Sequence, residues 1–163
     1  MIVAVDGPAG SGRTAWCRHV HPGFVPGESR DVERWAAAVA HEQERGIAVC
    51  DTDPIGLHYQ FGLYRLGAID RLAWRREAAR VRQAVGRERL GFVDLVLVAE
   101  PGDERTDLQG RLRPLQREWY GALEELDPGR VRFGLPDELP QAELRRNRHS
   151  VELLDLLIAA VGG

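Results

Sequence analysis

The residues best suited to chemistry stand near the start of the chain, in the segment VDGPAGSGRT. Residues 7–14 have the G-x-x-x-x-G-K-T spacing of a phosphate-binding loop, except that Arg13 replaces the lysine. Glycines let backbone amides turn inward around a phosphate, and the helix that follows would point its positive end at the same place. A glycine-rich turn without a ligand is the less favoured alternative. The expected nucleotide-binding residues are Gly7, Ala9, Gly10, Ser11, Gly12, Arg13 and Thr14.

We expect this loop to hold the phosphates of ATP or GTP, with the Thr14 hydroxyl as a ligand of Mg²⁺. Arginine at position 13 keeps the positive charge, but its planar group is longer than a lysine ammonium. All 22 basic residues of the chain are arginine, so Arg13 belongs to a chain-wide absence of lysine. Two hypotheses follow: Arg13 is a catalytic cation in a working phosphotransferase, or the loop binds nucleotide without efficient catalysis.

Two carboxylates follow the second apolar run, in the segment VCDTDP. We expect Asp51 to act as a catalytic base or as a metal partner. Residues two apart on an extended chain face the same side, which places Asp53 in the same cleft, as a substrate contact. The alternative is that Asp53 with Pro54 caps and starts the next helix. Asp6, just before the loop, is a weaker candidate near the magnesium.

Two further segments are candidates for the acceptor side of such a site. The charged segment 102–114 is expected as a loop that forms part of a lid at about 101–113, although a solvated loop would have the same composition. Its arginines, expected to stabilise a transferred phosphoryl group, are Arg105, Arg111 and Arg113. His58 and Tyr59 are expected to touch the substrate, whereas Phe61 and Tyr64 have the spacing of core residues.

The pattern of apolar runs determines what positions these residues. Strands are expected at 1–6, 46–53, 92–101 and 129–136, and they alternate with helices at 12–20, 32–45, 55–89, 115–127 and 151–161. The 55–89 region should break into two helices near Gly67, Asp31 or Ser29 should cap the helix before Gly46, and Ser150 should cap the last one. This alternation predicts an α/β protein with a three-layer P-loop NTPase fold, a mostly parallel sheet and helices on both faces, in a single domain 1–163. Ligands of such sheets bind beyond the carboxyl ends of the strands, where the loop and the acids fall.

The overall composition narrows the partners. The net charge is −3 and 44% of the residues are hydrophobic, which fits a globular protein and gives no general attraction to nucleic acid. No apolar run is long enough for a membrane span, and the chain opens without a basic leader, so we expect a cytoplasmic protein with two reduced cysteines. The expected partners are a nucleotide and a small-molecule acceptor, without nucleic acid or membrane; a homodimer is left open.

Three segments resemble known kinases. VAVDGPAGSGRT is similar to the start of small P-loop kinases of the cytidylate kinase type. VCDTDPIGLHYQFG resembles the strand-and-acid segment of the bacterial nicotinamide riboside kinase domain, and LVLVAEPGDERTDLQGRLRPLQREWYGALEEL resembles that family's third strand, lid and following helix. The resemblance implies a nucleoside or small-molecule kinase that uses ATP and Mg²⁺ and transfers the γ-phosphate to an acceptor hydroxyl. Arg13 in place of lysine departs from the family pattern.

Overall fold

One parallel sheet lies at the centre of the protein. The computed structural model describes residues 1–8, 10–100 and 107–162, and within them four strands form a sheet in the order β2-β1-β3-β4. The strands are β1 (Ile2–Asp6), β2 (Ala48–Cys50), β3 (Leu95–Val98) and β4 (Val131–Phe133). All neighbours are parallel, and Ala4 of β1 pairs with Cys50 on one side and Val96 on the other. The predicted α/β class is confirmed.

Six helices surround the sheet in the described part of the chain. They are α1 (Arg13–Val20), α2 (Asp31–Arg45), α3 (Leu57–Arg65), α4 (Arg71–Gly86), α5 (Leu108–Leu126) and α6 (Val151–Ala160). Gly46 ends α2 in the left-handed conformation, and Ser150 caps α6 by accepting from the Leu153 N–H, as predicted. The break near Gly67 is also confirmed. The expected cap of α2 is wrong: Arg30 occupies the cap position without a side-chain bond, and Asp31 is already helical.

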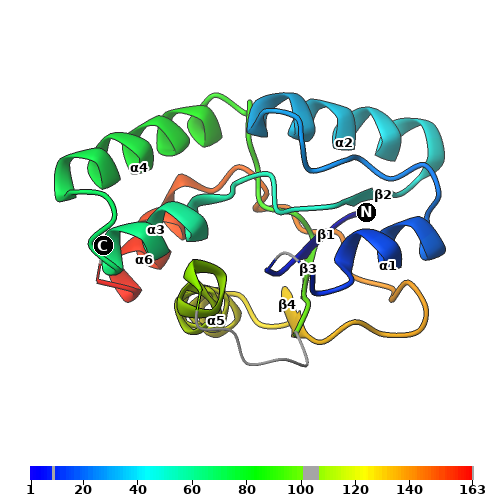
Figure 1. Cartoon of the computed structure of the whole chain (residues 1–163). Coiled ribbons are helices and arrows are strands. Elements are labelled where there is room, and N and C mark those ends of the chain that lie inside the picture. The colour runs from blue at the N-terminus through cyan, green and yellow to red at the C-terminus, as the bar shows by residue number, and fades with distance from the viewer. Residues whose placement is uncertain (9, 101–106, 163) are drawn as a thin grey trace.

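The sheet has a hydrophobic core on each face. Alternate residues of β1 pack into different cores, because successive side chains on a strand point to opposite faces. Ile2 and Ala4 pack with α2 to α6, whereas Val3 and Val5 pack with Cys17 of α1 and with residues of the segment that follows β4. That segment, orange in Figure 1, runs beside α1, and Trp16 donates its indole N–H to the Pro136 carbonyl at 2.5 Å. Helices therefore cover both faces of the sheet, as predicted.

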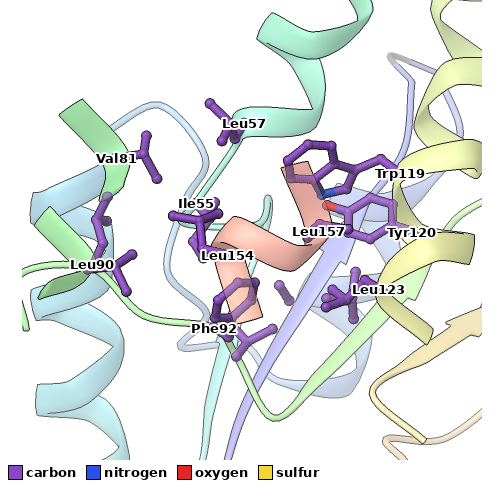
Figure 2. Close-up of a cluster of buried hydrophobic side chains, with 14 of the residues drawn as sticks. Ile55, Leu57, Val81, Leu90, Phe92, Trp119, Tyr120, Leu123, Leu154 and Leu157 are labelled. Carbon is purple, nitrogen blue, oxygen red and sulfur yellow. The ribbon is translucent and has the colours of Figure 1, made fainter. Parts of the chain in front are cut away.

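The larger core is built around α6. Leu154 and Leu157 are fully buried between α4 and α5, close to Phe92 and Leu123 (Figure 2). Burying a leucine side chain contributes about 2 kcal/mol, so this cluster supplies much of the stability of that layer. Trp35, Trp74 and Trp119 are buried in the same core, and Phe61 packs against the latter two. No helix in the described residues has the length and apolarity to cross a bilayer.

The expectation of a loop over 102–114 is wrong for its second half. Asp107 caps α5 by accepting from the Gly110 N–H at 3.1 Å, and the helix runs from Leu108 through Pro114 to Leu126. Gly110 and Pro114 give the segment the composition of a loop, but Leu112 is buried, and a Cβ on Gly62 of α3 would lie only 2.6 Å from its Cδ2. Tertiary packing thus outweighs local propensity here.

Two arginines, the buried Arg34 and the half-buried Arg148, join segments that are distant in sequence. Arg34 of α2 donates to the carbonyls of Gly27, Ser29 and Asp53, which ties the chain on either side of β2 to one helix. Arg148, before α6, forms a bidentate pair with Glu42 at 2.6 and 2.7 Å and also bonds Asp94. Each guanidinium makes several bonds in one plane, which a single ammonium group cannot reproduce.

Candidate functional site

The glycine-rich loop of residues 7–12, predicted to bind phosphate, leaves β1 and enters α1 at the carboxyl edge of the sheet. Gly7, Gly10 and Gly12 all have positive φ, at 153°, 80° and 83°. A Cβ on Gly7 would lie 2.9 Å from Ala99 Cβ, so the loop crosses the end of β3 at a distance that only glycine allows. Beside the start of α1, where backbone N–H groups can bind an anion, lies a hollow of about 370 Å³. It is lined by Gly10, Ser11, Gly12, Arg13, Thr14 and Ala15. The expected Ala9 lies outside the described residues.

Thr14, which lines this hollow, contacts Asp51. The Thr14 hydroxyl donates to Asp51 Oδ2 at 2.6 Å, which joins the first turn of α1 to the end of β2. Asp51 Oδ1 is buried and accepts no hydrogen bond, although Arg13 Nε lies 3.2 Å away in an ion pair. A hydroxyl and a carboxylate oxygen side by side are hard donors of the kind that Mg²⁺ prefers.

Arg13 turns back toward the sheet. Its Nη1 donates to the Gly7 carbonyl at 2.8 Å and lies 3.6 Å from Asp6 Oδ1, while its Nε faces Asp51. The side chain is 28% exposed. Arg13 therefore stands between the hollow on one side and two carboxylates on the other.

Asp6 and Asp53 form a second, deeper cluster with Tyr120 and His58. The Tyr120 hydroxyl lies 2.8 Å from Asp6 Oδ2, 3.0 Å from Asp53 Oδ2 and 3.3 Å from His58 Nδ1, and His58 Nε2 lies 3.3 Å from Asp6 Oδ2. Asp6, Asp53 and His58 have the residue types of a metal site, but the Tyr120 hydroxyl already contacts all three. The cluster is closed by its own hydrogen bonds.

The charges in this cluster shift one another's protonation. Burial opposes ionisation of Asp6, but His58, Tyr120 and the Gly7 N–H outweigh it and hold the pKa of Asp6 at about 2. Burial and the Asp6 charge raise the pKa of Asp53. Burial alone would lower the pKa of His58. The charges of Asp6 and Asp53 outweigh this effect and raise the pKa of His58 above its usual value. The Asp6 carboxylate thus favours the protonated form of the neighbouring His58 imidazole.

The expectation that Asp51 and Asp53 enter one cleft is wrong. Asp51 faces Thr14 and Arg13, whereas Asp53 faces Tyr120 and accepts from the Ile55 N–H at 3.1 Å. Thr52 between them has a φ of 141°, which breaks the extended geometry on which the prediction depended. The Asp53 contact to Ile55 is a local turn bond, while α3 itself is capped by Gly56.

A cleft of about 330 Å³ opens beside the loop, toward α3 and α5. It brings together His58 and Tyr59, expected as substrate contacts, with Arg13 and Arg113. Arg111 is exposed and does not line the cleft, because it stands on another side of α5. Arg105 and positions 101–106 of the expected lid lie outside the described residues. The roles of all these residues remain predictions.

Sequence reasoning missed the contribution of α5. Gln116 lines the cleft and donates from Nε2 to Asp6 Oδ1 at 3.2 Å, and Tyr120 stands one turn further along. Gln109, Leu112, Gln116 and Tyr120 are spaced three or four apart, so a helix here would have placed them on one face. This spacing can be seen in the sequence, but it indicates a shared face only if the helix is taken to begin at residue 108. Gly27, which also lines the cleft, had no signal of its own.

Comparison with known proteins gives a relationship at the level of fold. No family model matches the sequence, and no curated protein matches it. Among solved structures, the deoxyadenosine kinase from M. mycoides with bound dATP aligns over 100% of both chains with a TM-score of 0.59 and 12% identity. The chain has the fold of a P-loop kinase. Phosphate-binding loops join a strand to the helix that follows it. Residues 7–12 occupy the corresponding place here, between β1 and α1. The finer resemblances to nicotinamide riboside and cytidylate kinases remain predictions.

Proposed function

We propose that this protein is a phosphotransferase that binds ATP in residues 7–14 and transfers its γ-phosphoryl group to a hydroxyl of a small acceptor. The contact between Thr14 and Asp51 at 2.6 Å carries this proposal, because it joins the phosphate loop to an acid at the end of the neighbouring strand. A cleft large enough for a small molecule opens beside it. Phosphoryl transfer needs this combination of a phosphate cradle, an acid and an adjoining acceptor space.

The donor set fits Mg²⁺. Thr14 Oγ1 and both oxygens of Asp51 are close together, and the buried Oδ1 of Asp51 has no hydrogen-bond donor. Thr14 and Asp51 would hold the ion, which when bound supplies charge neutralisation for the phosphates. In the alternative role of Asp51 as the base, Oδ1 is the carboxylate oxygen with spare capacity to accept the proton of an attacking hydroxyl. Asp6, by contrast, is already occupied by Gly7, Gln116, Tyr120 and His58.

The chain's own groups divide between the two substrates. The amides of the loop and the guanidinium of Arg13 bind phosphate oxygens, and Arg113 faces the cleft from α5. Tyr59 and Gln116 offer an aromatic face and polar tips to the acceptor, and the His58 ring lines the same cleft while its two nitrogens face Asp6 and Tyr120. The fold shared with a deoxyadenosine kinase supports a nucleoside as the acceptor class.

The test is acceptor-dependent release of ADP from ATP and Mg²⁺, measured across a panel of nucleosides and deoxynucleosides. We expect Asp51→Asn to lower turnover at least 100-fold while nucleotide binding without metal is retained. Glu125→Gln, an exposed acid near the far end of α5, is the matched control and should leave turnover unchanged. Turnover unaffected by Asp51→Asn would reject the proposed role of Asp51, and no release with any acceptor would reject transfer.

A second function, nucleotide binding without efficient transfer, is favoured by one observation. The Arg13 side chain borders the hollow, but its guanidinium is engaged by Gly7, Asp6 and Asp51. Arg13→Lys separates the two functions. A gain in turnover of tenfold or more would identify a site weakened by its arginine, whereas a loss would identify a pocket built around it.

A further inference from the structure

Arg13 lines both spaces of the site. It borders the cleft toward α3 and α5 and also the hollow at the start of α1. A side chain that borders two spaces can serve one without leaving contact with the other. The present contacts of Arg13 all lie on the side of the sheet, at Gly7, Asp6 and Asp51.

Of the three contacts, only the one from Nη1 to the Gly7 carbonyl is a hydrogen bond, and the two ion pairs are loose enough to exchange. The ion-pair distances are 3.2 Å to Asp51 Oδ1 and 3.6 Å to Asp6 Oδ1, and neither pair meets the geometry of a hydrogen bond. The arginine is partly exposed but both carboxylates are buried, so its departure requires a new partner for the guanidinium and a new cation for the carboxylates. A phosphate chain carries several charges and accepts paired bonds from a guanidinium, which makes it the stronger partner.

The same contacts place a cation over the free oxygen of Asp51. Oδ2 is taken by the Thr14 hydroxyl, and Oδ1 faces Arg13 Nε. A divalent ion that approaches Oδ1 therefore meets a positive charge at the place where it must bind. As long as Arg13 remains there, the carboxylate is neutralised by an arginine.

We propose that Arg13 exchanges partners when a polyphosphate enters the loop, and that its departure uncovers the Asp51 carboxylate for a divalent cation. The inference rests on the proposed nucleotide site and specifies its regulation. Arg13 is in this sense a positioning residue for the metal site as well as a phosphate ligand. The arrangement keeps the metal site weak until phosphates are present.

The test measures Mn²⁺ binding to the nucleotide-free protein by calorimetry, at constant pH and ionic strength. Arg13→Gln should bind Mn²⁺ about tenfold more tightly than the wild type, because the competing cation is gone. Arg18→Gln, an exposed arginine on the same helix, removes the same charge and should change the affinity less than twofold. In the Asp51→Asn background, Arg13→Gln should give no gain. Thermal unfolding of each variant verifies that it is folded.

A second measurement separates this inference from the proposed function. Binding of tripolyphosphate in the presence of EDTA should be clear for the wild type and weakened at least tenfold by Arg13→Gln. If the wild type fails to bind tripolyphosphate, the proposed nucleotide site is wrong. If it binds but Arg13→Gln leaves Mn²⁺ affinity unchanged, or tightens it equally in the Asp51→Asn background, the partner exchange is wrong while the nucleotide site stands.

Discussion

The Tyr120 hydroxyl lies 2.8 Å from Asp6 Oδ2, although 114 residues separate the two in the chain. The same hydroxyl reaches Asp53, so one tyrosine of α5 joins the ends of β1 and β2. A tyrosine has one hydroxyl proton, and it can be donated to one carboxylate at a time. The cluster therefore depends on the proton of His58 as well, and it sets the distance between α5 and the edge of the sheet.

Tyr120→Phe should destabilise the protein. The change leaves two buried carboxylates without a shared donor, and an unsatisfied buried polar group costs about 1–3 kcal/mol. Urea unfolding measures this loss. Tyr64→Phe is the control, because the Tyr64 ring stacks on Trp74 outside the cluster, and it should cost much less. Equal losses for the two variants would contradict the role of the hydroxyl.

Gly7→Ala should weaken both folding and nucleotide binding. The φ of 153° is strained for alanine, and the new Cβ would meet Ala99 at 2.9 Å. We expect a loss of about 2–3 kcal/mol in unfolding free energy and at least a tenfold loss of ATP affinity. Gly121→Ala on α5 is the matched control, since its Cβ would meet nothing within 4 Å, and a helical alanine there should stabilise by about 0.5–1 kcal/mol. Tight ATP binding by Gly7→Ala would refute the close approach.

Thr52 offers a test of backbone strain. At an ordinary position alanine is more favourable than glycine, but at a φ of 141° the order should reverse. We expect Thr52→Gly to be about 1 kcal/mol more stable than Thr52→Ala in chemical unfolding. The usual order, with alanine the more stable, would mean that Thr52 is relaxed and that something else separates Asp51 from Asp53.

Glu42 should make stability depend on acid pH. Its hydrogen bonds from Arg148 outweigh burial and lower its pKa from 4.5 to about 2. Because the folded pKa is depressed, the stabilisation is complete above pH 4.5 and is lost as the pH falls toward 2. Glu42→Gln should be on the order of 2 kcal/mol less stable than the wild type at pH 6, and the difference should shrink toward zero near pH 2.

Urea titrations at several pH values measure the Glu42 effect. Glu125→Gln changes an exposed glutamate and should follow the wild-type pH profile. A difference between Glu42→Gln and the wild type that stays constant from pH 6 to pH 2 would show that Glu42 stabilises by packing rather than by its charge.

The local parts of this protein were readable from its sequence, and the long-range parts were not. The glycine-rich loop has a fixed spacing and the strands are short apolar runs, so the strand–loop–helix arrangement could be predicted. The start of α5 could not be predicted. Gly110 and Pro114 are typical of a loop, whereas the helix is stabilised by the burial of Leu112, a long-range contact. The separation of Asp51 from Asp53 depends on one unusual backbone angle, the φ of Thr52. Threonine is not a residue type that indicates a positive φ, so this angle could not be predicted.

The structural arginines have a consequence for alkaline conditions. Arg34 and Arg148 connect distant segments through guanidinium groups, which keep their charge throughout the range in which lysine ammonium groups lose their protons. With no lysine in the chain, none of these ties weakens as the solution becomes basic. His58 differs, because its charge is held by Asp6 and Asp53 against the cost of burial. In the described residues, deprotonation of His58 would thus remove a buried cation beside the glycine-rich loop of residues 7–12, while the arginine contacts of the scaffold persist.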